Sequence, residues 1–283
     1  VSGAGDMPDY NYTRTPWFAY NPMIKTIVVE EGITGIGRYA FHMCEQLTSI
    51  SLPESLKSIG VFAMRDCISL SSLTIPSGVE TIDPHCLIGN RKLERIEVAY
   101  GNPNYSSRGN CLMDKNGTIL QATLNTVIPT EGEITIGEYS FYAFWDMKSL
   151  TIPGNVTSIG RYAFGATGLQ HVVIPAGITE IAPYAFYECT QLEDIVLPEG
   201  LRSIGEQAFA AANSLGDLTI PGSVTSIADD AFYAIRNLSD IYYGNTREAW
   251  AATGADSDHW DVQTEVITIH CTDGDIVTNN VAQ

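Results

Sequence analysis

The chain has 283 residues, of which 33 are acidic and 15 basic, so its formal net charge is −18. Hydrophobic residues make up 45% of the sequence, which is enough for a large core and excludes a wholly disordered chain. The negative charge argues against nucleic-acid binding, because phosphates would repel such a surface. No apolar run approaches the roughly 18 residues of a membrane span.

The first 23 residues lack the periodic pattern that follows and carry a group of aromatic side chains. We predict that residues 1–23 form an N-terminal cap in which Trp17, Phe18 and Tyr20 cover the first repeat, because the open end of a repeat array exposes apolar surface. Val1-Ser2-Gly3 resembles the tail of a longer β-hairpin, so we expect the cap to be truncated. No signal-peptide core is present, so we expect that any signal peptide has been cut away or never existed, and that no anchor lies within this sequence.

A repeat of 23 residues begins at Ile24. The segment LTSISLPESLKSIGVFAMRDCIS aligns without a gap with LSSLTIPSGVETIDPHCLIGNRK, the segment that follows it. Two branched aliphatic positions, two residues apart, predict a short strand with one buried face, and the proline that follows ends this strand. The repeats begin at Ile24, Leu47, Leu70, Leu93, Met147, Leu169, Leu192, Leu215 and Leu238.

The second half of each repeat has an isoleucine, often a glycine, and then a small residue before a phenylalanine. One such unit cannot bury its own apolar face, but stacked units can. We therefore predict a β-rich solenoid over residues 24–240, with about eight coils spaced about 4.8 Å apart. The phenylalanine column contains Phe41, Phe141, Phe164, Phe186, Phe209 and Phe232, with Met64 and Leu87 in the two remaining repeats.

The pattern L-x-x-I-x-I-P…I-G-x-x-A-F-x-x-C resembles the BspA-like, or Treponema-type, leucine-rich repeat family, from Ile24 to about His270. The segments SGAGDMPDYNYTRTPWFAY and IYYGNTREAW resemble the lead-in and the closing cap of family members. The resemblance implies a leucine-rich repeat fold, secretion or attachment to a bacterial cell surface, and adhesion to host proteins or other cells. It implies no catalytic residues, so we expect neither enzymatic activity nor a cofactor.

An insertion interrupts the array at about residues 101–126. Asn116-Gly117 lies between two alternating runs, which predicts a β-hairpin. We expect this hairpin to protrude, with Asp114, Lys115 and Asn116 at its tip as a second recognition feature. The alternative is a decorated loop with no partner.

Residues 241–283 are expected to form a C-terminal cap, in which Trp250 and Trp260 cover the last coil. The stretch 256–261 collects acidic residues beside a histidine, and we weigh a bound cation there against an ordinary solvated loop. It lacks the frame of a calcium loop, so the solvated loop is preferred. The polar residues from Asp273 to the end are expected to be a mobile tail.

The six cysteines are too regularly placed to suggest a disulfide framework. Cys44, Cys67 and Cys189 share one repeat column, and Cys86 replaces the small residue before the phenylalanine column. We interpret them as buried thiols that make weak hydrogen bonds in the turn. Cys44 and Cys67, in adjacent repeats, could lie close enough for a disulfide, but nothing requires one.

No nucleophile–base set, phosphate loop or metal motif is present, so we expect no catalytic and no metal site. The candidate site is instead the outward-facing side of the predicted sheet in the last repeats. One column there is acidic and its neighbour is apolar, which suits a basic partner or a cation. The candidate residues are His171, Val173, Asp194, Val196, Asp217, Thr219, Asp240 and Tyr242.

A second stripe, on the turns, contains Tyr39, Phe62, Tyr139, Tyr162 and Tyr184. Such rings more often lean on neighbouring coils than bind a ligand. We expect a monomer that binds a protein or another cell-surface macromolecule, with glycans included among the alternatives. A further alternative is a spacer that only displays other domains.

Overall fold

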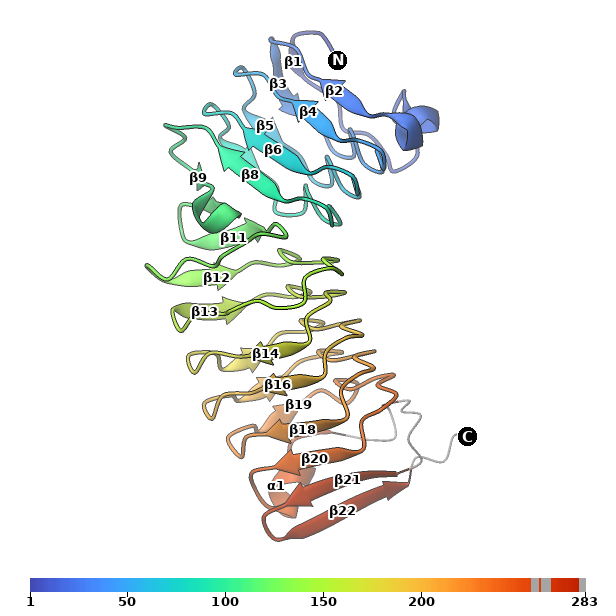
Figure 1. The fold of residues 1–283 in the computed structure, drawn as a ribbon, viewed down its shortest axis with the longest axis vertical. Helices are drawn as coiled ribbons and strands as arrows, with labels where there is room; N and C mark the ends of the chain where they lie inside the picture. The colour runs from blue at the N-terminus through green and yellow to red at the C-terminus, as the bar shows by residue number, and fades with distance from the viewer. Residues whose placement is uncertain (256–259, 261–265, 280–283) are drawn as a thin grey trace. The chain divides into compact units, whose positions relative to one another are not determined.

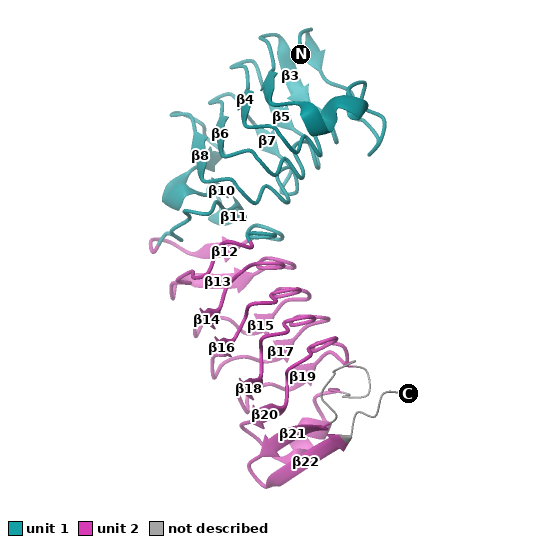
Figure 2. Ribbon diagram, turned by 45° about the vertical axis from the view of Figure 1, so that its right-hand side comes forward, with its two compact units in different colours: residues 1–129, 137–144 teal, residues 130–136, 145–283 magenta. Residues whose placement is uncertain are grey.

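The computed structural model describes residues 1–255, 260 and 266–279, which fold into short strands with very little helix (Figure 1). The chain divides into two compact units (Figure 2). Unit 1 contains residues 1–129 and 137–144, and unit 2 contains residues 130–136 and 145–283. Each unit is a stack of coils, which makes the chain a β-solenoid as the repeat predicted.

The elements of unit 1 are β1 (Gly5–Asp6), the 3-10 helix η1 (Phe18–Met23), β2 (Thr26–Val28), β3 (Ile33–Ile36), β4 (Ser49–Ser51), β5 (Ser58–Ile59), β6 (Ser72–Ile75), β7 (Thr81–Ile82), β8 (Arg95–Val98), β9 (Tyr105–Ser106), the 3-10 helix η2 (Arg108–Asn110), β10 (Leu112–Asp114) and β11 (Thr118–Gln121). Strands β1, β3, β5 and β7 form one sheet. Strand β2 pairs with β4, and β6 pairs with β8. All these pairs are parallel.

The elements of unit 2 are β12 (Ile134–Ile136), β13 (Val156–Ile159), β14 (His171–Val173), β15 (Glu180–Ile181), β16 (Asp194–Val196), β17 (Ser203–Ile204), β18 (Asp217–Ile220), β19 (Ser226–Ile227), β20 (Asp240–Tyr243), α1 (Arg247–Ala251), β21 (Val266–Cys271) and β22 (Gly274–Asn279). Successive coils pair in parallel and in register, so that Val172 lies beside Ile195 and Leu218 beside Ile241. Residues one repeat apart therefore become neighbours in space.

The phenylalanine column of unit 2 is a continuous stack of rings. Phe164, Phe186, Phe209 and Phe232 follow one another with ring centroids 5.3, 5.6 and 5.9 Å apart and planes within 16° of parallel. All four are fully buried. In unit 1, Phe41 lies under the cap residue Trp17, with ring centroids 5.8 Å apart.

The turn that carries this column has its own ladder of backbone hydrogen bonds. Phe186 N donates to Ala208 O at 2.8 Å, and Glu188 N donates to Ala210 O at the same distance. Two residues of the turn are left-handed in most coils, for example Tyr184 (φ 59°) and Glu188 (φ 55°). The repeat pattern gave no sign of this conformation, because tyrosine and glutamate rarely adopt it.

The N-terminal cap packs on the first coil mainly through Trp17, whose Nε1 donates to Ala40 O at 2.8 Å. Phe18 stacks on the buried His42 ring, with centroids 6.0 Å apart. Tyr20, in contrast, is 62% exposed. The prediction that Tyr20 covers the first coil was wrong, because η1 turns this ring away from the stack.

At the other end, Trp260 is fully buried and meets the ring of Phe232 edge-on at 5.0 Å. The prediction of a mobile tail from Asp273 was wrong for the residues that follow it, because β22 pairs antiparallel with β21. The acidic stretch 256–261 lies outside the described residues except for Trp260.

The insertion forms the predicted hairpin, with β10 antiparallel to β11 and to β9. It does not protrude as expected. Leu112 and Leu120 belong to the core of unit 1, and Tyr105 Oη accepts a hydrogen bond from Ile82 N at 2.8 Å. The strands thus act as part of the stack, because their apolar residues extend the core.

The cysteines are free, and all but Cys271 are buried. Cys67 Sγ donates to Phe41 O and Cys189 Sγ donates to Phe164 O, both at 3.1 Å. This confirms the interpretation of the cysteine column. Burial raises the pKa of the Cys189 thiol to about 11.

Candidate functional site

The eight candidate residues predicted to lie on one outward-facing surface come from four strands of unit 2, β14, β16, β18 and β20 (Figure 1). Pairing puts His171 beside Asp194 and Val173 beside Val196, and β16 is in contact with β18. The next pair of strands sets Asp217 beside Asp240 and Thr219 beside Tyr242. We call these eight residues, with His270 and Asp275 described below, the unit 2 face.

The apolar column of this face is open to solvent. Val173 is 62% exposed, Val196 is 53% exposed and Tyr242 is 45% exposed. Single exposed apolar residues are ordinary on protein surfaces. Val173 and Val196 lie side by side on paired strands, and Tyr242 follows beyond the exposed Thr219. Parallel strands are only about 4.8 Å apart, so these side chains form one contact area that is interrupted by Thr219.

The acidic column carries an arrangement that the sequence did not reveal. His171 Nδ1 donates to Asp194 Oδ2 at 2.8 Å, and His270 Nε2 of β21 donates to Asp240 Oδ1 at 2.9 Å. The like-charge repulsion expected along the column is therefore reduced at both of its ends. His270 was missed because it lies in the cap, outside the repeat frame.

His270 also contacts the last strand, where its Nδ1 donates to Asp275 Oδ1 at 3.1 Å. Both ring nitrogens donate to carboxylates, which requires the protonated imidazolium. The contact with Asp240 is the main cause of a raised pKa for His270, and the contact with Asp275 adds to it. In turn, hydrogen bonds from Ser239 and His270 lower the pKa of Asp240.

The tip of the insertion hairpin belongs to unit 1. Lys115 and Asn116 are exposed, whereas Asp114 Oδ1 accepts hydrogen bonds from Asn116 N at 2.9 Å and Thr118 N at 2.8 Å. Asp114 therefore shapes the turn. Lys115 and Asn116 are the more exposed residues of the tip, and Asp114 is half-buried.

The aromatic stripe on the turns is half-buried and engaged with its own neighbours. In unit 2, Tyr162 and Tyr184 stack with centroids 4.5 Å apart, Arg161 lies 4.3 Å over the Tyr184 ring, and Tyr184 Oη donates to Glu206. These contacts agree with the expectation that the rings lean on neighbouring coils.

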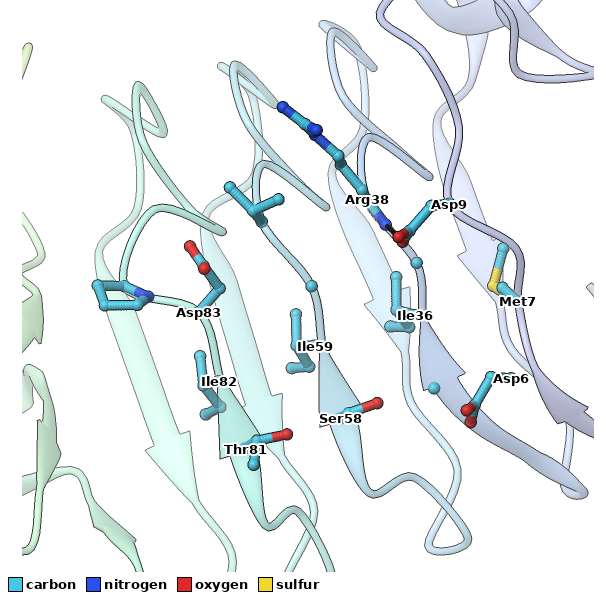
Figure 3. Close-up of a pocket in the computed structure, with 15 residues that line it drawn as sticks. Asp6, Met7, Asp9, Ile36, Arg38, Ser58, Ile59, Thr81, Ile82 and Asp83 are labelled. Carbon is cyan, nitrogen blue, oxygen red and sulfur yellow. Dashed lines mark hydrogen bonds between the residues drawn. The ribbon is translucent and has the colours of Figure 1, made fainter.

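Unit 1 contains a groove of about 670 Å³ over the sheet β1-β3-β5-β7 (Figure 3). Asp6, Ser58 and Thr81 lie in one row across it, and a side chain on Gly35 would come within 2.8 Å of both Asp6 Oδ1 and Ser58 Oγ. The sequence did not identify this groove, because it depends on β1 pairing with β3 at the edge of the repeat array. Among the described residues, no group of three or more His, Cys, Asp or Glu is placed to hold a metal ion.

A family model of the BspA type leucine rich repeat region matches six copies over residues 14–116 and 121–250. The chain belongs to the BspA-type leucine-rich repeat family. This agrees with the parallel coils and with the column of turn phenylalanines. No curated protein matches the chain significantly.

Solved structures share the fold of this chain at low sequence identity. One is a leucine rich cell surface protein from Faecalibacterium prausnitzii A2-165, 22% identical with a TM-score of 0.59, over 84% of this chain and 65% of that protein. Another is the pneumococcal vaccine antigen PcpA, 20% identical with a TM-score of 0.56, over 78% of this chain and 51% of PcpA. The chain thus spans less than two thirds of the length of either protein. In the described part of the chain, no helix has the length and apolar character needed to cross a membrane.

Proposed function

We propose that this chain is part of a bacterial protein that is secreted or held at the cell surface, and that it binds a protein or another surface macromolecule through the unit 2 face. Membership of the BspA-type family supports this proposal, and so does the description of the Faecalibacterium protein as a cell surface protein. The observation that carries it is the convergence of exposed apolar and charged residues from successive coils on one sheet face.

The physical basis of binding would be a pre-formed surface. The side chains of the face are carried by paired strands whose alternate residues, such as Leu218 and Ile241, are buried in the core, so little backbone entropy is lost when a partner binds. The apolar column offers contact area, and the acidic column offers selectivity between partners of opposite charge. We propose no enzymatic activity for this chain.

The exposed apolar column favours binding over the spacer alternative, in which the array only displays other domains. The glycan alternative relied on Tyr162 and Tyr184 as stacking platforms. It receives less support, because these rings already stack on each other and lie under Arg161.

A direct test applies the labelled full chain to immobilised extracellular-matrix proteins and to bacterial and epithelial cells. The triple variant Val173→Thr, Val196→Thr and Tyr242→Thr keeps strand-forming residues but removes the apolar column. We expect it to lose at least about tenfold in affinity for any target that the wild type binds. The matched control is Val28→Thr, a 52% exposed valine in the same repeat position of unit 1, which should bind like the wild type.

Two results would overturn the proposal. One is a target that the triple variant binds as tightly as the wild type. The other is the absence of any target in the panel for a correctly folded chain, which would favour the spacer.

A further inference from the structure

The negative charge of the unit 2 face is distributed unevenly. Asp194 is paired with His171, and Asp240 is paired with His270. Asp217 lies between these two aspartates in the column, and within the described residues no ion pair or side-chain hydrogen bond involves its carboxylate. The middle of the column therefore holds a carboxylate whose charge is not compensated.

The surroundings of Asp217 are apolar on one side. Its strand continues through the buried Leu218 to the exposed Thr219, which lies beside Tyr242. Val196, on the preceding strand, is 53% exposed. When a basic side chain of a partner reaches Asp217, the exposed apolar residues of the face lie next to it. A neighbouring apolar side chain of the same partner would cover this apolar surface.

We infer that the unit 2 face takes a partner that presents an arginine or lysine at Asp217 beside an apolar side chain, and that protonation of His270 weakens this complex. The inference rests on the proposed function, because it names the partner chemistry and the regulation of the same face. Charge complementarity supports it, because a basic group gains a carboxylate that no side chain in the described part of the chain neutralises.

The charged groups around His270 support the direction of the pH effect, and those around His171 complete the charges at the other end of the column. His171 faces Asp194 at 2.8 Å and Glu193 at 3.9 Å, while Lys148, from the preceding coil, donates to Trp145 O. His270 faces Asp240 on β20 and Asp275 on β22, and the Arg247–Asp273 pair lies at the turn beyond it. Deprotonation of His270 leaves Asp240 and Asp275 without a cation, so the face becomes more negative as pH rises.

The test uses the full chain and defined peptide probes at about 0.15 M salt, where exposed long-range attraction is screened. The first probe is an acetylated and amidated hexapeptide of alternating valine and arginine. In the second probe neutral citrulline replaces each arginine, and in the third glutamate does. Binding is followed by amide chemical shifts, which also report where on the chain each peptide binds.

We expect the arginine peptide to shift the amides of β16, β18 and β20 and to bind at least about tenfold more tightly than the citrulline peptide. Asp217→Asn should weaken it by about fivefold. The matched control Asp229→Asn removes an exposed aspartate from a turn of the same unit and should leave affinity unchanged. Lowering the pH from about 8 to about 5.5 should weaken binding several-fold, and this dependence should shrink in His270→Asn.

Equal binding of the arginine and citrulline peptides would overturn the inference, as would equal losses in Asp217→Asn and Asp229→Asn. Amide chemical-shift changes confined to strands other than β16, β18 and β20 would also overturn the inference. These outcomes leave the proposed function standing if the apolar triple variant still loses its macromolecular target. Asp217→Asn keeps the inference testable even if His270→Asn loosens the terminal hairpin, because Asp217 is exposed on β18 and not on the hairpin strands.

Discussion

Phe209 and Phe232 lie one repeat apart in the sequence, and their rings stack with centroids 5.9 Å apart and planes within 6° of parallel. Each ring is fully buried. Because each coil contributes one ring to the stack, a ring removed from the middle leaves a cavity that the coils on both sides must share. The stability of unit 2 therefore depends on the whole column and not on any single coil.

Phe209→Ala should lower the free energy of unfolding by about 3–5 kcal/mol, through lost burial and the cavity that remains. Phe209→Leu keeps most of the volume and should cost clearly less. Urea denaturation followed by circular dichroism measures both. Similar losses for the two variants would contradict the ring stack as the main source of stability.

Two adjacent alanines in the same turn give a prediction about backbone strain. Ala211 is left-handed, with φ 58°, whereas Ala210 is not among the left-handed residues and is fully buried. Ala211→Gly should stabilise the chain, or leave it unchanged, because glycine adopts this conformation at no steric cost. Ala210→Gly should destabilise it by about 0.5–1 kcal/mol. Thermal unfolding of the pair gives the comparison, and a larger loss in Ala211→Gly would contradict the assigned backbone.

The cysteines should differ in reactivity by burial. Burial raises the pKa of Cys111 to about 12 and that of Cys189 to about 11, and thiols react as thiolates. Only Cys271 is partly exposed. We expect a thiol reagent at about pH 8 to modify at most Cys271 in the native chain and all six cysteines in urea. Fast modification of several native thiols would show that the coils open readily.

The contacts of His270 predict a pH-dependent terminal hairpin. Its pKa is raised by Asp240 and Asp275, so the stabilisation is complete below the ordinary histidine pKa of about 6.5 and is lost as pH rises through the raised value. Amide hydrogen exchange in β21 and β22, corrected for intrinsic rates, should be slower at about pH 6 than at about pH 8.5.

His270→Asn should remove most of this difference, whereas His171→Gln should leave it unchanged, because His171 lies on β14 at the far end of the column. Histidine ring signals in a pH titration provide an independent readout. A His270 titration at or below the ordinary histidine pKa would rule out the two-carboxylate contact.

Stability and binding should respond to pH in opposite directions. Protonated His270 holds β20, β21 and β22 together, while the same proton reduces the negative charge of the unit 2 face. At acidic pH the terminal strands are therefore more stable, but the face attracts a partner with basic side chains less strongly.

The sequence by itself determined the coils, the parallel register and the exposed and buried sides of each strand. This was possible because identical repeats must stack in register: the column of a residue in the sequence fixes its neighbours in space, as with Asp217 and Asp240. The burial of the cysteines that share one repeat column was predicted by the same argument. The eight candidate residues were placed together for this reason, although their role in binding stays a prediction.

The tertiary structure alone decided the features that lie outside the repeat frame. His270 reaches Asp240 only because β21 adds a parallel strand to the last coil, and Leu112 enters the core only because the insertion pairs within the stack. The left-handed turn residues and the groove beside β1 belong here as well. Periodicity predicts the neighbours of a repeated residue, but caps and insertions occur once, and their contacts depend on packing that no repeat encodes.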